Sequence, residues 1–504
     1  MRALALLILG AGVCGAAPAW AEAPRVIPAD VSAATPARTA TAAVAAPEPA
    51  AEDKVDFMHV FARRGLHDLS NERVNAYGQI SLIGDYKHAF HAPYTNLHGS
   101  PNSLTPDVEG SWTGTATLFL AGRLWRGAEA YVVPELISER PLSRLTGLGG
   151  TIQNAELQKS GGAAPALYMS RVYLRQTIGL GGARVEKRSD AMQLGGVVDS
   201  RRLVVTVGKF SILDFLDRNS FAGDLRRQFL NISFLTHTAY DFAADARGYT
   251  WGGVAELYFD DWALRWGRIA GPQDPNQLPV DYRIWEHYGD QLELEHTHKI
   301  LGQGGAIRVL GYRNREVMGR FDDAAAAYRA DHRKNATTCA GFNYNSGNAT
   351  APDLCWARKP NVKLGVGVNL EQRLGDDVGV FFRGMYADGH TEVFSFMSND
   401  RSLSFGVLSK GTVWRRPTDS AGIAFGVGWI SAEHAAYLNL GGIDGFIGDG
   451  KIRQAAESVL EIFYSVNVTR SLWLSADYQH ITNPAYNADR GPVEIVGGRL
   501  HAEF

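Results

Sequence analysis

Two pairs of histidines have spacings that metal ligands use, His88 with His91 and His296 with His298. Neither pair is accompanied by carboxylates at a spacing that would complete a site for zinc or for a harder ion, so we interpret these histidines as polar residues at the rim of the fold. The motifs H-E-x-x-H, G-x-S-x-G and the P-loop are absent from the sequence. We therefore predict no catalytic residue, no metal and no cofactor, and we expect a protein that is not an enzyme.

The cysteines can form a covalent link. Cys14 lies in an N-terminal segment that we expect to be removed, whereas Cys339 and Cys355 lie in the longest connection of the chain. Two cysteines that reach an oxidising compartment are expected to form a disulfide. A metal site would need further ligands, and the nearest histidine, His332, is a poor addition. We predict a disulfide between Cys339 and Cys355.

The N-terminus has the organisation of a secretory signal peptide. A short basic start is followed by an apolar segment over residues 3–15, and Ala19 and Ala21 stand at the two positions that a signal peptidase recognises. We predict cleavage before Glu22, so the protein leaves the cytoplasm. Lipoprotein attachment at Cys14 is a weaker alternative, because the residue before it is not small.

Composition argues against two classes of protein. The 504 residues carry a net charge of −3 at pH 7, which is too small for a phosphate-binding surface, so nucleic acid is not expected as a partner. Beyond the N-terminus no apolar run approaches the roughly 18 residues that a membrane helix needs, which excludes a multi-helix membrane protein. Length alone suggests two or more soluble domains, but a very large barrel is compatible with it as well.

From residue 74 onward, apolar residues recur at every second position. Ile80 and Leu82, for example, alternate with Gln79 and Ser81, as expected for a strand with one apolar and one polar face. The pattern predicts sixteen strands, at residues 74–86, 112–125, 128–137, 167–178, 202–210, 249–259, 262–269, 291–296, 305–313, 362–372, 378–387, 402–408, 420–429, 457–466, 472–480 and 493–504.

The lengths of the connections indicate what these strands form. Every second connection is mostly short, such as residues 126–127 and 260–261, and the intervening ones are long, such as residues 314–361. Short turns on one side and long loops on the other are typical of an outer-membrane barrel, and closure satisfies every backbone hydrogen bond in lipid. The connections 179–201 and 409–419 are exceptions on the short side. We predict an all-β fold, a transmembrane antiparallel β-barrel of about 16 strands, with a secreted β-sandwich or propeller as the alternative.

The last strand ends on Phe504, and a terminal aromatic residue is the feature that the assembly machinery of the outer membrane recognises. The predicted organisation of the chain is a signal peptide (1–21), an Ala- and Pro-rich flexible tether (22–54), a short periplasmic lead-in or helix (55–72) and an outer-membrane porin barrel (73–504).

If the apolar faces contact lipid, the polar faces line a water-filled lumen. These faces carry both signs of charge, at Arg123, Glu129, Glu135, Arg171, Arg175, Arg202, Glu256, Arg265, Glu293, Glu295, Arg308 and Arg383. Arginines and carboxylates interleaved with aromatic residues suit a neutral polyhydroxylated solute, because they donate to and accept from hydroxyl groups. The alternative is that many of these charges pair with one another and stiffen the wall.

The connection 211–248 follows the fifth strand, at the place where a loop folds inward and narrows the pore in sixteen-stranded porins. It contains Asp214 and Arg226 among many charged and aromatic residues. Such a mixture can pack inside a barrel and still present polar groups to a solute, although surface ion pairs are the commoner fate of Asp and Arg side chains.

Several separate motifs occur in an order that resembles the carbohydrate-selective (OprB-type) porins, at residues 168–177, 207–211, 245–252, 483–492 and 498–504. The resemblance covers roughly residue 70 to the end. It implies a sixteen-stranded outer-membrane barrel that passes glucose and related sugars through an arginine-lined constriction. By position, Arg171, Arg175 and Glu135 are the best candidates for that lining.

The function we expect is passive, selective diffusion of carbohydrates through a water-filled pore in the bacterial outer membrane. The predicted pore-lining and sugar-contacting residues are Arg123, Glu135, Arg171, Arg175, Arg265, Asp214 and Arg226. A nonspecific or other-solute porin of the same fold is the first alternative, and a surface barrel that binds an extracellular partner is the second. Expected partners are small sugars, outer-membrane lipid and lipopolysaccharide, and the outer-membrane assembly machinery. A homotrimer is the candidate oligomer, because porin barrels often assemble as trimers.

Overall fold

The computed structural model describes residues 25–27, 56–157, 162–395 and 397–504. The predicted signal peptide and nearly all of the predicted tether lie outside the described residues. Among the described helices, none is both long and apolar enough to cross a bilayer.

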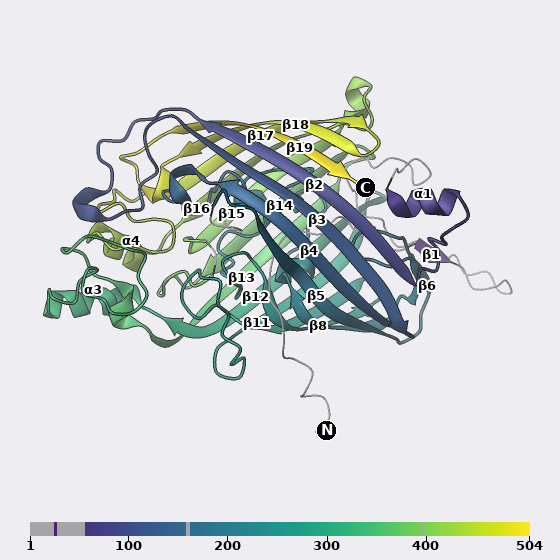
Figure 1. Cartoon of the computed structure of the whole chain (residues 1–504), viewed down its shortest axis with the longest axis horizontal. Coiled ribbons are helices and arrows are strands. Elements are labelled where there is room, and N and C mark those ends of the chain that lie inside the picture. Colours follow the sequence, from purple (N-terminus) through teal and green to yellow (C-terminus); the bar gives the residue numbers. More distant parts are fainter. Residues whose placement is uncertain (1–24, 28–55, 158–161, 396) are drawn as a thin grey trace.

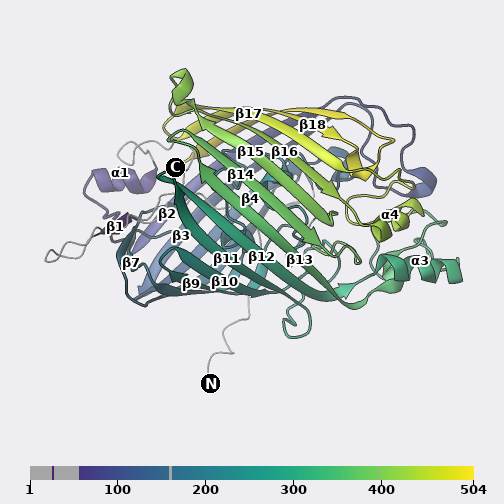
Figure 2. The ribbon, with the colours of Figure 1, turned by 180° about the vertical axis from the view of Figure 1, so that it is seen from behind.

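Sixteen antiparallel strands form a closed barrel, as predicted from the alternation of apolar and polar residues. In chain order they are β2 (Val74–Lys87), β3 (Glu109–Trp125), β4 (Ala128–Arg140), β5 (Ala166–Gly179), β8 (Arg202–Phe210), β9 (Thr250–Phe259), β10 (Trp262–Ile269), β11 (Tyr288–Ile300), β12 (Gln303–Met318), β13 (Lys359–Arg373), β14 (Val378–Ala387), β15 (Arg401–Lys410), β16 (Ser420–Trp429), β17 (Glu457–Thr469), β18 (Leu472–Thr482) and β19 (Val493–Glu503). Each strand pairs with its neighbours in sequence order, and β19 pairs with β2 to close the barrel (Figure 1, Figure 2).

The faces of the strands are arranged as a membrane requires. On β2 the outward Ile80 and Leu82 are 40% and 53% exposed, whereas Ser81 between them is fully buried. The same order, with apolar side chains outside and polar side chains inside, recurs around the barrel. A soluble β-sandwich would bury the opposite face, so the burial pattern excludes the sandwich alternative.

The short turns gather at one end of the barrel together with helix α1 (Phe57–Arg63) and the C-terminal strand end (Figure 1). The side chain of Asp56 caps α1 by accepting a hydrogen bond from the backbone N–H of His59 at 2.9 Å. At this end the connection 179–201 contains β6 (Arg184–Lys187) and β7 (Gly196–Asp199), which form a small sheet with β1 (Arg25–Ile27). This sheet explains why the connection is not short. We refer to this end as the periplasmic end.

The long connections gather at the opposite, extracellular end, where α3 (Phe321–Ala330) and α4 (Ala432–Asn439) lie (Figure 1). The remaining short helices of the connections are η2 (Leu97–Gly99), η3 (Leu142–Arg144), η4 (Ile212–Asp214), α2 (Ile232–Leu235), η5 (Leu354–Ala357), η6 (Gly411–Trp414) and η7 (Pro484–Tyr486). The helix η6 occupies the second exceptional connection on the periplasmic side, residues 411–419.

Candidate functional site

The connection 211–248 between β8 and β9 lies inside the barrel, and we call it the inward loop. Its groups form hydrogen bonds with Glu293 on β11, Asn369 on β13, Arg383 on β14 and Glu461 on β17. These strands belong to different parts of the wall. The inward loop therefore crosses the lumen, and its Asp and Arg side chains are mostly buried.

Asp217 fixes the inward loop to the wall. Arg383 donates from Nε to Asp217 Oδ1 at 3.0 Å and from Nη2 to the Asp217 carbonyl oxygen at 3.0 Å. The other carboxylate oxygen accepts from Thr236 Oγ1 at 2.7 Å and from the backbone N–H of His237 at 2.9 Å. Because all of these groups are buried, Asp217 supplies the charge that compensates the guanidinium of Arg383.

A second segment, residues 141–157 between β4 and β5, also enters the lumen. Glu156 forms an ion pair with Arg226 of the inward loop, with 2.6 Å between Oε1 and Nη2. The same carboxylate accepts from Thr113 Oγ1 and Thr115 Oγ1 of β3, each at 3.2 Å. Residues 141–157 are thus held between β3 and the inward loop. Nothing in the sequence pattern of residues 141–157 indicates that they enter the lumen.

Arg171 and Asp214, which the sequence predicts separately as lining residues, form an ion pair. Arg171 donates to both carboxylate oxygens of Asp214, from Nε at 2.7 Å and from Nη2 at 2.6 Å, and its guanidinium lies 5.3 Å from the ring centre of Tyr249. Glu135 accepts from Thr117 Oγ1 at 2.8 Å and from the hydroxyl of Tyr168. Both Arg171 and Glu135 are fully buried. Arg171 joins β5 to the inward loop, and Glu135 on β4 joins its two neighbouring strands, β3 and β5.

Arginines and glutamates alternate around the wall near the periplasmic turns, and we call them the charge row. They are Glu256 on β9, Arg265 on β10, Glu293 and Glu295 on β11, Arg308 on β12 and Glu371 on β13. Arg265 contacts the three glutamates of β9 and β11 at 2.9 to 3.2 Å. Arg308 contacts Glu295 at 2.5 Å and Glu371 at 3.4 Å. Each guanidinium is therefore shared between carboxylates, and the row presents donors and acceptors side by side.

Arg175 on β5 has a different environment. It donates to the hydroxyls of Tyr131 and Tyr173, at 3.2 and 3.3 Å, and to the carbonyl oxygen of Met192 at 3.3 Å. Its guanidinium lies 4.8 Å from the ring centre of Tyr131, and the two tyrosine rings stack at 4.8 Å. Within the described part of the chain it forms no ion pair. Arg175 is thus a cation on a platform of two aromatic rings, next to the charge row.

Arg123 lies apart from the other predicted lining residues. Its Nη1 donates to Asn71 Oδ1 at 3.0 Å and its Nη2 to the carbonyl oxygen of Gly195 at 3.1 Å. Both partners belong to segments at the periplasmic end, the lead-in before β2 and the connection between β6 and β7. The structure therefore places Arg123 at the periplasmic rim.

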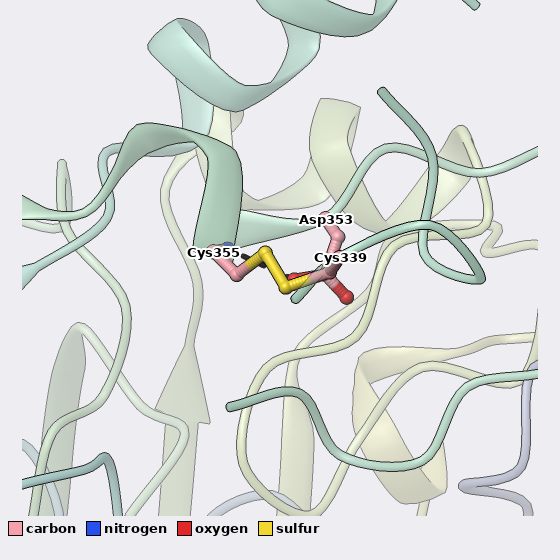
Figure 3. A group of neighbouring side chains, drawn as sticks. All are labelled: Cys339, Asp353 and Cys355. Atoms are coloured by element: carbon pink, nitrogen blue, oxygen red, sulfur yellow. Dashed lines mark hydrogen bonds between the residues drawn. A yellow bond between two sulfur atoms is a disulfide. The ribbon is translucent and has the colours of Figure 1, made fainter. Parts of the chain in front are cut away.

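The two cysteines of the longest connection form a disulfide, Cys339 to Cys355, with 6.4 Å between the Cα atoms. Asp353 brings a carboxylate within 4.8 Å of both sulfur atoms (Figure 3). That carboxylate accepts from the backbone N–H of Cys355 at 2.9 Å and so caps η5. Since both sulfurs are used in the disulfide and Asp353 is a helix cap, this group is structural.

The structure brings the predicted residues into two clusters. Arg171, Asp214, Glu135 and Arg226 lie where the inward loop meets β3, β4 and β5, and Arg175 and Arg265 lie toward the periplasmic end. Sequence reasoning missed Glu156 and Asp217 as partners of these clusters. No alternation in the sequence indicates that Glu156 points inward, because Glu156 lies in a connection and not in a strand.

Comparison with known proteins identifies the family. The sequence model of the carbohydrate-selective porin, OprB family, matches residues 116–504. The high-pH structure of Pseudomonas putida OprB is similar at 15% identity and a TM-score of 0.60, over 85% of this chain and 94% of that chain. The outer membrane channel DcaP of Acinetobacter baumannii matches at 12% identity and a TM-score of 0.43, over 86% and 97% of the two chains. No curated protein matches. The chain belongs to the OprB family of carbohydrate-selective porins, and it is an outer-membrane channel for sugars.

Proposed function

We propose that the channel passes neutral monosaccharides of the size of glucose by passive diffusion, and that the sugar is recognised on the periplasmic side of the inward loop by Arg175 and the charge row. The observation that carries this proposal is the alternation of guanidinium and carboxylate groups beside stacked tyrosine rings. Each sugar hydroxyl can donate to a carboxylate and accept from an arginine, and the two buried tyrosine rings hold the Arg175 guanidinium in place.

The balance of charge supports a neutral solute. Arg265 and Arg308 are each shared between glutamates. With Arg175, the surface has four carboxylates against three guanidinium groups, so charges of both signs alternate and do not form the ring of one sign that would select an ion. A sugar that replaces its water shell with such groups gains no excess charge interaction, and the binding stays weak enough for the sugar to leave.

The remaining predicted residues support this surface in our proposal. Arg171 is paired with Asp214 of the inward loop, and Arg226 of the inward loop is paired with Glu156, so we assign these residues the role of holding the inward loop in place. Glu135 accepts from Thr117 of β3 and Tyr168 of β5, and we assign it a role in joining the strands of the wall. Arg175 is only partly buried and lacks an ion pair among the described residues, so we propose it as the principal sugar-contacting arginine of the predicted set.

The test is single-channel conductance in planar bilayers, titrated with glucose. Wild-type protein should show saturable block by glucose, and the variant Arg175→Gln should need about tenfold more glucose for the same block, because a charge-assisted hydrogen bond is lost. The matched control is Arg126→Gln, at an exposed periplasmic turn, which should leave the titration unchanged. Identical titrations for Arg175→Gln and wild type, or equal permeation of glucose and an amino acid of similar size, would contradict the proposal.

A further inference from the structure

Charged side chains also occur on the outside of the barrel, on three neighbouring strands at the extracellular end. Arg268 is one residue from the end of β10, and Tyr288 and Asp290 lie at the start of β11. Arg313 and Arg315 lie in the last part of β12. We call these five residues the arginine patch. Their outward direction follows from alternation, since the residues between them, Gly267, Gly289, Gln291, Tyr312 and Asn314, are buried in the barrel.

The strand register brings the members of the patch side by side. Arg268 is paired with Asp290, Asp290 with Arg313, and Tyr288 with Arg315. Arg268 donates to both oxygens of Asp290, from Nε at 2.8 Å and from Nη2 at 2.7 Å. The guanidinium of Arg268 lies 4.1 Å from the ring centre of Tyr288, and the guanidinium of Arg313 lies 5.4 Å from the same ring centre. The three arginines therefore form one surface around Tyr288.

This surface has an excess of positive charge. Asp290 neutralises Arg268, but neither Arg313 nor Arg315 forms an ion pair with any carboxylate in the part of the chain that the structure describes. Arg313 donates to the Tyr288 hydroxyl, and Arg315 donates to the backbone carbonyl oxygen of Glu286. Two cations on a lipid-facing wall are costly unless a counter-charge covers them.

The surroundings indicate where that counter-charge comes from. The next outward row toward the membrane centre is apolar and consists of Trp266, Leu292, Gly311 and Val366. Three of these side chains are about half exposed, at 46%, 51% and 53%, and Gly311 adds no side chain to the row. On the other side of the patch, the loop residues Tyr282 and Trp285 are 63% and 79% exposed. The patch thus lies between an apolar belt that faces acyl chains and an aromatic, solvent-facing loop, which is the depth of lipid headgroups.

We propose that the arginine patch binds the phosphorylated headgroup of a glycolipid of the outer leaflet, the lipid A part of lipopolysaccharide. Arg313 and Arg315 would contact a phosphate group, since guanidinium groups bind phosphate through paired hydrogen bonds. The acyl chains would pack on the row of Trp266, Leu292 and Val366, where Gly311 leaves room. The site lies on the outer wall and is separate from the lumen.

The experiment measures lipid binding to the folded barrel in detergent by native mass spectrometry. Lipid A should remain bound to wild-type protein, and dephosphorylated lipid A should bind at least tenfold more weakly. The double variant Arg313→Gln/Arg315→Gln should bind lipid A about thirtyfold more weakly, because two basic residues near an anionic surface are lost. The double variant Arg313→Lys/Arg315→Lys, which keeps both charges, should retain most of the binding.

The matched control is Arg333→Gln, whose side chain is 90% exposed on an extracellular connection; its lipid binding should equal that of wild type. Heat-modifiable migration and an unchanged glucose titration show that the patch variants are folded and that the lumen is intact. If the double Gln variant does not fold, Arg315→Gln alone should give a smaller loss.

Three results would overturn the proposal. The first is equal binding of lipid A by the double Gln variant and wild type. The second is binding of inorganic phosphate alone as tight as that of lipid A, which would make the lipid irrelevant. The third is a change of oligomeric state in the variant with lipid binding unchanged, which would make this wall an interface between two copies of the chain.

Discussion

Asp217 is the residue on which the position of the inward loop depends most. It lies in the left-handed region, with φ of 54°, and its carboxylate serves Arg383, Asn369 and Thr236 at once. A left-handed backbone favours Asn and Asp among side chains other than glycine. The substitution Asp217→Asn therefore keeps the backbone and nearly the same shape, and it removes only the charge.

We expect Asp217→Asn to destabilise the folded barrel by about 3–5 kcal/mol, because the buried guanidinium of Arg383 loses its counter-charge. Release of the inward loop should also make single-channel currents larger and noisier. Thermal unfolding in detergent and bilayer recordings measure the two effects. The control Asp274→Asn, at an exposed position of an extracellular connection, should change neither, and an unaltered current in Asp217→Asn would show that the loop has other sufficient anchors.

At the residue scale, the sequence predicts faces better than partners. Alternation places Arg265 on the inward face of β10 and Arg175 on the inward face of the second half of β5. On β5 the pairing with β4 shifts register next to Arg171, so that Arg171 shares the inward face with Tyr168, three residues before it. Alternation does not show that Glu156 reaches Arg226, because residues 141–157 carry only two charges and have the composition of an ordinary extracellular loop. Partners in the lumen depend on how connections fold back, and alternation carries no information about that.

At the scale of elements, α3 and α4 pack together at the extracellular end through His434. The ring of His434 stacks on Phe321 at 4.2 Å, its Nδ1 lies 3.1 Å from Asp400, and its Nε2 lies 3.1 Å from Asp444. Burial lowers the pKa of His434, but the two carboxylates outweigh burial and raise the pKa to about 9. At neutral pH the imidazolium therefore joins α4 to two connections.

The sign of the pH dependence follows from the raised pKa. The contact contributes its full stability below the ordinary pKa of histidine, about 6.5, and loses it as the pH rises through about 9. We expect His434→Gln to exchange amide hydrogens of α4 faster than wild type at pH 6, with the difference vanishing near pH 10. Taking the ratio of variant to wild type at each pH removes the intrinsic pH dependence of exchange.

The control for this experiment is His390→Gln. His390 faces α4 through Glu433 at 3.8 Å, but both side chains are 44% exposed, and exposed pairs contribute little. Its exchange ratio should stay near one at all pH values. A constant ratio for His434→Gln as well would show that His434 is not protonated in the folded protein.

The disulfide acts on a single connection. It joins residues 16 apart, and the loop-entropy estimate for such a closure is about 3 kcal/mol. We expect Cys339→Ser/Cys355→Ser to be cleaved faster by protease between these positions, with barrel unfolding unchanged. Wild-type protein treated with a reductant is the matched control and should behave like the variant. A lower unfolding temperature of the barrel in either sample would show that the connection supports the wall.

At the scale of the whole molecule, the number, order and pairing of the strands could be predicted, because a period of two is imposed on every strand that separates lipid from lumen. The largest errors in bounds are at β12, expected over residues 305–313 and observed at Gln303–Met318, and at β11, expected over residues 291–296 and observed at Tyr288–Ile300. The outward positions at the two ends of β11 are polar, with Tyr288 and Asp290 at one end and His296 and His298 at the other. Alternation is lost where the strand leaves the apolar belt, so the bounds there could not be predicted.

Closure of the barrel depends on the pairing of β2 with β19. The backbone N–H of Gly78 donates to the carbonyl oxygen of Phe504 at 2.6 Å, and the N–H of Phe504 donates to the carbonyl oxygen of Gly78 at 2.9 Å. The ring of Phe504 lies where a Cβ on Gly78 would be, 2.2 Å from its Cε2 atom, and it contacts Phe57 of α1 edge-on, with 5.6 Å between ring centres. The ring of Phe504, the residue after β19, therefore fits only because the residue opposite it on β2, Gly78, has no side chain.

Gly78→Ala and Gly84→Ala test this requirement within one strand and on one face. A Cβ on Gly78 must displace the Phe504 ring, which should cost about 1–3 kcal/mol as overpacking does, whereas a Cβ on Gly84 meets nothing within 4 Å. We expect Gly78→Ala to lower the fraction of protein that refolds to the heat-modifiable form on electrophoresis, and Gly84→Ala to match wild type. The double variant Gly78→Ala/Phe504→Ala should refold to the same fraction as Phe504→Ala alone, because without the Phe504 ring the Cβ added at position 78 has nothing to displace. If the two glycine variants refold equally well, the ring of Phe504 can move aside without cost, and closure rests on the backbone hydrogen bonds between β2 and β19.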